Sequence, residues 1–166
     1  MKRKCGAYGK EMREYRDKII YDLFNLRFTI CLYYFIILTM TREVLKKRLK
    51  NFALRIIKLS NSLPNNITGK TLGNQIIRSG TSPGANYRSA CVGKSEKDFL
   101  NKLKMVEEEL DETLYWLELI IESGLIKPHL LQDLIQENEG LLKIIVSSIT
   151  TVKKKQAILV NNKLNK

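Results

Sequence analysis

The sequence predicts an all-α protein, an antiparallel up-down-up-down four-helix bundle over residues 40–155. Three observations predict it. Apolar residues recur alternately three and four positions apart in separate stretches, the spacing of one helix face. Pro occurs only three times in 166 residues, which favours long helices. No stretch shows the alternation of a strand, and short connections make successive helices antiparallel neighbours.

The first helix is expected to begin near Thr41, a suitable N-cap, and to end at Leu63 because Pro64 follows. Six of its apolar residues share one face: Leu45, Leu49, Phe52, Ile56, Leu59 and Leu63. The second helix is expected to run from about Thr68 to Gly93. Its inward residues are expected to be Leu72, Ile76, Ile77, Tyr87 and Ala90.

The middle of the second helix is unusual because small residues and Pro83 interrupt it. Proline removes one backbone hydrogen bond and crowds the carbonyl four residues earlier, so we expect a kink or break between Ser79 and Pro83. Two interpretations of the small residues remain open. They let a neighbouring helix approach closely, which we favour, or a helix restarting near Gly84 offers free N–H groups to a phosphate.

The third helix is expected to begin at Ser95, with Asp98 close to a capping box, and to end at Gly124. Its seam is Phe99, Leu103, Val106, Leu110, Thr113, Leu117 and Ile120. The fourth helix is expected to begin at Pro128, which suits a first helical position. Its repeat is Leu131, Leu134, Asn138, Leu141, Ile145, Ser148 and Val152. Residues 156–166 are expected to form a basic tail.

Residues 1–39 differ from the rest and are expected to form a separate extension, helical or disordered. Their apolar run at 28–38 is about half of the 20 residues that span a bilayer as a helix. Leu38–Met40 offers no small-residue cleavage site for a signal peptide. Three interpretations are open: an amphipathic extension, an anchor that touches a membrane without stable insertion, or upstream codons ahead of a true start at Met40.

Few side chains suit catalysis or metal binding. His129 is the only histidine and is expected at the surface, so one chain can form no histidine triad or His-based metal cluster. Cys5, Cys31 and Cys91 lie far apart, in neither disulfide nor zinc spacing, and suit a reducing cytoplasm. A run of acids on the third helix could hold a metal but is more typical of a solvated or ion-paired face: Glu107, Glu108, Glu109, Asp111 and Glu112. We therefore predict no enzymatic activity, no cofactor, no metal and no small-molecule substrate.

Charge is distributed unevenly in this chain, whose formal net charge is +12. The first helix carries seven basic residues against Glu43, a net of +6, and the third carries nine acids against three lysines, a net of −6. These helices could neutralise each other within a subunit or between subunits. Arg48 and Arg55 flank the first seam. The remaining outer lysines could contact phosphates without reading base sequence: Lys46, Lys47, Lys50, Lys58 and Lys94.

Tyr115 and Trp116 on the third helix are open to two interpretations. Exposed aromatic rings can stack on nucleic-acid bases. Aromatic residues at helical spacing more often lie between helices or subunits, and Trp116 projects to one side of the seam. We therefore favour a subunit interface for both residues.

Several motifs occur in order along the chain: Gln75, Arg78-Ser79, Ser82, Gly84–Arg88, then Ser95 and Asp98–Leu100, then Asp111–Glu118. With these motifs the sequence resembles, from about Met40 to Lys154, the four-helix-bundle proteins encoded in intervening sequences of bacterial 23S rRNA genes. The resemblance implies a ring-like homopentamer without established enzymatic activity. A related branch, the accessory protein of diversity-generating retroelements, is basic and binds nucleic acid. Two residues depart from the family pattern: Pro83 replaces a usual aliphatic residue, and Ser89 a frequent acid.

The sequence thus predicts a cytoplasmic, homo-oligomeric helical bundle that binds RNA or a ribonucleoprotein, such as the ribosome, through basic surfaces without sequence specificity. The alternative is a structural or protein-adaptor oligomer whose charges serve assembly. Binding to RNA at different salt concentrations distinguishes them.

Overall fold

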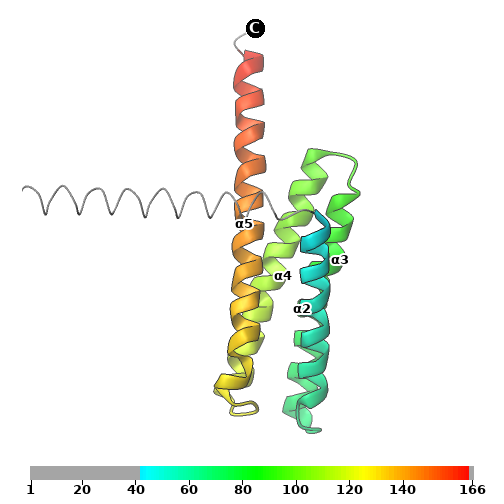
Figure 1. The fold of residues 1–166 in the computed structure, drawn as a ribbon, viewed down its shortest axis with the longest axis vertical. Coiled ribbons are helices and arrows are strands. Elements are labelled where there is room, and N and C mark those ends of the chain that lie inside the picture. Colours follow the sequence, from blue (N-terminus) through cyan, green and yellow to red (C-terminus); the bar gives the residue numbers. More distant parts are fainter. Residues whose placement is uncertain (1–41, 165–166) are drawn as a thin grey trace, which may run out of the picture. The chain divides into compact units, whose positions relative to one another are not determined.

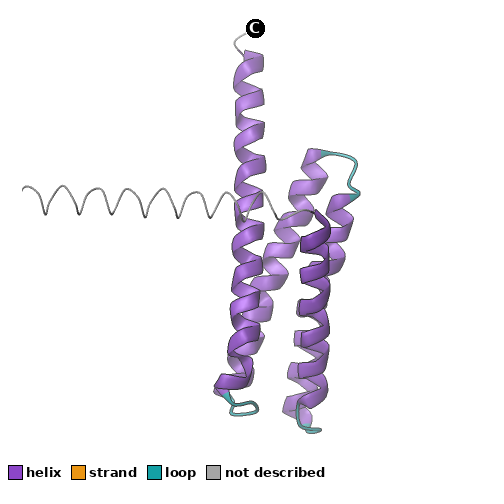
Figure 2. Cartoon of the chain, in the orientation of Figure 1, coloured by secondary structure: helices purple, strands orange, loops and turns teal. Residues whose placement is uncertain are grey.

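The structure is a computed structural model that describes residues 42–164, with side chains described as far as residue 158. The expectations for residues 1–39 and for the Thr41 cap lie outside these residues. Four helices follow one another along the described chain: α2 (Arg42–Ser62), α3 (Ile67–Cys91), α4 (Glu96–Glu122) and α5 (Pro128–Leu164). Figures 1 and 2 show them packed side by side without strands in the part described. The predicted all-α four-helix bundle is confirmed.

Each helix packs against its neighbours in the chain, and the last helix also meets the first. α2 contacts α3, α3 contacts α4, α4 contacts α5, and α5 contacts α2, whereas no Cα atoms of the pairs α2–α4 and α3–α5 lie within 8 Å of each other. Pairs of contacting residues run in opposite order along α2 and α3, since Ile56 lies against Gly80 and Leu49 against Gly84. Because α2 packs against α3 and α5 and not against α4, α2 and α4 occupy diagonal positions in the bundle.

Local sequence signals set the ends of the helices. The Asn66 side chain caps α3 by accepting a hydrogen bond from the Gly69 N–H at 2.7 Å, so α3 begins one residue before the expected Thr68. The Ser95 hydroxyl accepts from the Asp98 N–H at 3.1 Å, which confirms the predicted start of α4. α4 ends in a Schellman motif around Gly124, whose φ is +73°.

Most residues of the predicted seams form the core, whereas Leu63, Ile77, Phe99, Ser148 and Val152 are half-buried. The largest fully buried side chains come from all four helices: Phe52, Leu49, Ile56, Ile76, Leu103, Leu110, Leu117, Ile120, Leu141, Ile145, Val106 and Asn138. Buried Asn138 donates through Nδ2 to the Leu110 carbonyl at 3.0 Å and so joins α5 to α4. Ile149 is also buried, which the predicted repeat on α5 did not include.

We expected a kink or a break near Ser79–Pro83, and the break is wrong because α3 runs as one continuous helix through Pro83. Two hydroxyls close to the proline bond back to carbonyls one turn earlier: Thr81 to Ile77 at 2.8 Å and Ser82 to Arg78 at 2.7 Å. Because the helix does not restart, no helix N-terminus exists near Gly84 to bind a phosphate.

The small residues of α3 serve close helix packing, the interpretation favoured from the sequence. A Cβ at Gly80 would lie 2.7 Å from Cγ1 of Ile56, and one at Gly73 would lie 2.9 Å from Oγ of Ser60. The Ser60 hydroxyl also donates to the Gly73 carbonyl at 3.2 Å. The backbones of α2 and α3 therefore approach each other along a row of glycines.

α5 is the longest helix described and continues to Leu164, through the stretch in which the sequence placed a tail beginning at residue 156. Figure 1 shows it passing the turn between α3 and α4. Along the described helices, none combines the length and apolar composition needed to cross a membrane.

Candidate nucleic-acid interface

Four lysines occupy the outer side of α2, and we call this set the lysine face: Lys46, Lys47, Lys50 and Lys58. At about 100° per residue Lys47, Lys50 and Lys58 lie on the side of α2 opposite its buried seam, and Lys46 lies about a quarter turn from the seam. Three of them are exposed and one is half-buried. The set spans thirteen residues, so its first and last members lie about 18 Å apart along the helix at 1.5 Å per residue.

Lys46 is the one member of the lysine face with an ion-pair partner among the described residues. Its Nζ lies 2.8 Å from Oε1 of Glu43, one turn earlier. The hydrogen bond and charge of Lys46 lower the pKa of Glu43, so this carboxylate stays ionised at neutral pH. Lys47, Lys50 and Lys58 therefore carry the uncompensated charge.

The acidic helix does not neutralise the lysine face. α4 carries the nine acids, but it lies diagonally across the bundle from α2, and no ion pair joins the two helices among the described residues. The interhelical ion pairs of the described chain join other helices: Arg48–Glu137, Arg78–Glu112 and Lys155–Glu96. Direct pairing of α2 with α4 inside one subunit, one of the two routes left open by the sequence, is therefore wrong.

The two arginines beside the α2 seam differ in their surroundings. Arg48 is half-buried and binds Glu137 of α5 with two hydrogen bonds, from Nε at 3.0 Å and from Nη2 at 2.9 Å. This two-pronged pair holds α2 to α5, the helix pair with the least extensive contact. Arg55 is exposed and takes part in no ion pair among the described residues.

Lys94 lies apart from most of the lysine face. It follows α3 in the short turn before α4, at the end of the bundle where α2 begins. There it lines a cleft together with Arg42 and Lys155. The structure therefore groups Lys94 with the start of α2 and places it farthest from Lys58.

Two apolar residues on the outer side of α2 were not singled out from the sequence. Leu54 is 54% exposed and Ile57 is 38% exposed, and both lie among the lysines. Their exposure was predictable from the sequence, because neither residue falls on the spacing of the buried seam. An outer face with lysines around two aliphatic side chains can contact a protein as well as a phosphate backbone.

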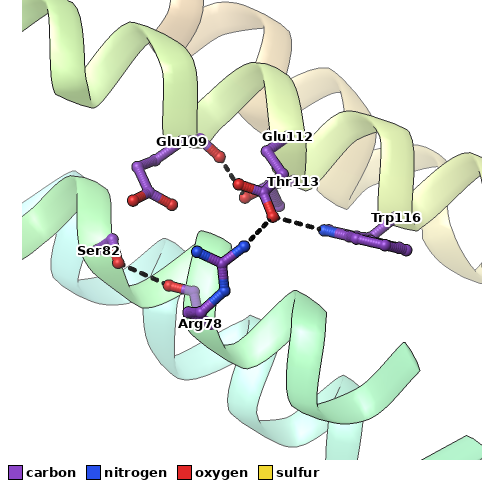
Figure 3. Close-up of polar contacts among 6 residues, drawn as sticks. All are labelled: Arg78, Ser82, Glu109, Glu112, Thr113 and Trp116. Carbon is purple, nitrogen blue, oxygen red and sulfur yellow. Dashed lines mark hydrogen bonds and ion pairs between the residues drawn. The ribbon is translucent and has the colours of Figure 1, made fainter. Parts of the chain in front are cut away.

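The predicted aromatic pair lies on α4, where Trp116 turns toward α3. Trp116 is half-buried, and its indole N–H donates to Oε1 of Glu112 at 3.0 Å. The same carboxylate pairs with Arg78, which reaches across from α3 (Figure 3). Tyr115 is 53% exposed and packs edge-on against Trp116, with ring centroids 5.0 Å apart. Tyr115 is thus the ring that a partner can reach.

Glu109 stands beside this cluster with one carboxylate oxygen buried and no hydrogen-bond partner (Figure 3). Burial raises the pKa of Glu109, and repulsion from Glu112 adds to the effect, while Arg78 opposes it. The sequence treated Glu109 as one acid of a surface run. Glu109 faces Arg78 of α3 and is half-buried, whereas Glu108 is exposed.

Groups suited to catalysis are sparse in the described chain. His129 lies exposed at the start of α5. The described residues contain no cluster of three or more histidine, cysteine, aspartate or glutamate side chains that could hold a metal. Cys91, at the end of α3, is half-buried, and its neighbour Tyr87 has a pKa raised to about 12, chiefly by burial.

Comparison with known proteins identifies relatives for the bundle. The family model of the 23S rRNA-intervening sequence protein matches residues 42–147. A crystal structure from Bacteroides thetaiotaomicron VPI-5482, described as a protein of unknown function from the S23 ribosomal protein family, shares 37% sequence identity. The match has a TM-score of 0.63 and covers 67% of this chain and 99% of that one. No protein of curated function matches the chain.

Proposed function

Because the chain belongs to the 23S rRNA-intervening sequence protein family, we propose that it is a non-enzymatic, cytoplasmic protein that binds RNA or a ribonucleoprotein. The lysine face is the observation that carries the proposal. Three of its four cations are exposed and without an ion-pair partner among the described residues. Exposed lysines bind phosphates without reading base edges, so binding is expected to show little sequence preference.

A salt titration tests this proposal. Binding of a structured RNA to the full chain, followed by fluorescence anisotropy, is expected to weaken steeply as salt rises because counterions are released. About four phosphate contacts give a log–log slope of about −3 to −4. Replacing Lys46, Lys47, Lys50 and Lys58 by glutamine is expected to flatten most of this slope and leave the melting temperature nearly unchanged.

A control with the same charge change uses four lysines on other parts of the described chain: Lys70, Lys104, Lys127 and Lys143. All four are exposed, and Lys143 has a weak partner in Glu139, as Lys46 has in Glu43. Their replacement by glutamine is expected to leave the slope nearly unchanged. Equal losses in both quadruple variants would show that net charge alone is responsible and would refute the lysine face as the binding surface.

Self-association is the second candidate, and the exposed aliphatic pair Leu54 and Ile57 favours it. These side chains suit a protein surface with an acidic rim. The outer side of α4 offers one, because Tyr115 lies exposed there between acids such as Asp111 and Glu118. We propose a head-to-tail contact from α2 of one copy to α4 of the next, which forms a ring if the rotation closes. Because this contact would cover the lysine face, it is an alternative to RNA binding on that face.

Native mass spectrometry tests this assembly. The family resemblance implies five subunits, so the full chain at micromolar concentration is expected to show a pentamer. A monomer under these conditions would remove the assembly proposal and leave RNA binding to be judged by the salt titration alone.

A further inference from the structure

A cleft of about 450 Å³ lies at the end of the bundle where α2 begins and α3 turns into α4. We call it the end cleft. α5 forms its remaining wall with residues from Thr151 to Lys155, because this helix continues past the α3–α4 turn. All four described helices thus contribute to one concave site. Its volume lies within the range of about 300–1,000 Å³ that is usual for small-molecule sites.

The lining of the end cleft combines three cations and the carboxylate of Glu96 with an apolar surface. Arg42, Lys94 and Lys155 supply the charge, and the apolar part comes mainly from Ala90, Phe99 and Val152. Lys155 is partly neutralised, since its Nζ lies 2.7 Å from Oε1 of Glu96. Arg42 and Lys94 have no carboxylate within ion-pair distance among the described residues.

This combination selects the chemical class of ligand. A free oxyanion would use the cations and leave Phe99 and the rest of the apolar lining without a role. An apolar ligand would leave Arg42 and Lys94 without a partner. A nucleotide satisfies both parts, because its phosphate is anionic and its base has flat faces that stack on aromatic rings.

The lysine face leads toward the end cleft. Arg42, Lys46 and Lys50 are four residues apart on α2, so they lie in one row with about 6 Å between successive positions along the axis. A strand of RNA that follows this row toward the start of α2 reaches Arg42 at the cleft. Lys94 faces it from the α3–α4 turn.

We propose that the end cleft binds one unpaired nucleotide, with its phosphate between Arg42 and Lys94 and its base against Phe99. This inference rests on the proposed function, because it places one nucleotide of the RNA strand that the lysine face holds. It adds a preference for RNA with a free end or a flipped-out base over a continuous duplex.

Calorimetric titration of the full chain with adenosine 5′-monophosphate tests the cleft at low salt. Adenosine and inorganic phosphate serve as the two partial ligands, and both are expected to bind at least about tenfold more weakly than the nucleotide, because each fills one part of the site. Chemical-shift changes in amide spectra are expected at Gly93, Phe99 and Thr151. Equal affinity for phosphate and nucleotide would overturn the assignment, as would a nucleotide that does not bind at millimolar concentration.

Variants of the lining locate the binding. The double variant Arg42→Gln and Lys94→Gln is expected to bind the nucleotide about tenfold or more weakly, the loss typical of charge-assisted contacts. Phe99→Leu keeps the apolar volume and is expected to weaken nucleotide binding without changing phosphate binding. Lys127→Gln, at the opposite end of the bundle, is the control and is expected to change neither. Unchanged affinity in the double variant would place the nucleotide elsewhere and overturn the inference.

The outcome for the end cleft is distinguishable from that for the lysine face. If structured RNA binds with the full salt slope and the nucleotide does not bind, only this inference fails. If the nucleotide binds in the cleft and the quadruple lysine variant binds RNA like the parent, only the lysine face fails.

Discussion

Gly80 sits where α3 packs most closely on α2, and its replacement by alanine measures that proximity. The new methyl group would lie 2.7 Å and 2.8 Å from Cγ1 and Cγ2 of Ile56, and 3.1 Å from its Cβ. These atoms are close to the α2 backbone, and Ile56 is fully buried, so they cannot move aside by a simple rotation. The two helices must shift apart.

The expected size of the effect comes from two opposing contributions. Overpacking a closely packed core costs about 1–3 kcal/mol. Alanine is favoured over glycine inside a helix by about 1 kcal/mol. Gly80→Ala is therefore expected to lower the free energy of unfolding by up to about 2 kcal/mol. Gly84→Ala is the matched control, since its methyl group would lie 3.8 Å from the Leu49 carbonyl oxygen, an ordinary contact, and it is expected to stabilise the protein.

Urea unfolding followed by circular dichroism at a fixed protein concentration compares the variants. Ile56→Ala removes the two atoms in conflict, so Gly80→Ala is expected to become neutral or stabilising in that background, which a double-mutant cycle detects. If Gly80→Ala is as stable as Gly84→Ala in the parent background, α2 and α3 do not approach as closely as described, and the reasoning fails.

Three further substitutions test other contacts. Arg48→Gln leaves Glu137 half-buried without its partner and is expected to lower the free energy of unfolding in urea by about 0.5–1.5 kcal/mol. The loss is expected to be smaller when Glu137→Gln is added, and an undiminished loss in the double variant would contradict the pairing. The pKa of Glu109 is raised in the folded protein, so between the ordinary carboxyl pKa and the raised one the folded protein keeps a proton that the unfolded chain has released. The free energy of unfolding therefore falls as pH rises through this range. Glu109→Gln is expected to raise the melting temperature by about 1–3 °C at pH 7 and by less at pH 4 in calorimetry, and an equal gain at both would refute this origin. Tyr115→Ala is expected to weaken self-association about tenfold or more and to lower the melting temperature less than Trp116→Ala does at the same protein concentration. Light scattering and melting curves separate the two roles, and an unchanged oligomer in Tyr115→Ala would remove Tyr115 from the interface.

The spacing of apolar residues predicted most of the fold, because burial on one helix face leaves a periodic record in the sequence. The seam of α4 shows this most clearly, since six of its seven predicted residues are buried and the seventh, Phe99, is half-buried. Capping residues set the helix ends in the same direct way. Ser95 and Pro128 start their helices where expected.

Pro83 shows where local reasoning failed. A proline inside a helix loses one hydrogen bond in any setting, but whether the helix breaks depends on tertiary packing. Pro83 is buried against the bundle, and the hydroxyls of Thr81 and Ser82 bond to carbonyls of the preceding turn. The closeness of Gly80 to Ile56 holds α3 along α2 through this region. Periodicity alone contains none of these contacts.

The candidate site was predictable in part. The outward position of the lysine face follows from helical geometry, and the structure places Lys47, Lys50 and Lys58 there as exposed side chains. The end cleft was not predictable, because it joins four helices whose relative heights depend on how they pack. The length of α5 is a further reason, since the wall from Thr151 to Lys155 exists only where this helix runs past its neighbours.

The diagonal placement of α2 and α4 gives the described bundle an electric dipole across its long axis, with a helix of +6 on one side and a helix of −6 on the other. A polyanion therefore exerts a torque on the approaching protein and turns the lysine side toward itself, while the acidic side is repelled. At physiological salt the screening length is about 8 Å, slightly less than a helix diameter of about 10–12 Å, so this rotation occurs only in the last stage of approach. Rising salt is accordingly expected to reduce the rate of productive encounter, because fewer collisions arrive with the correct side forward.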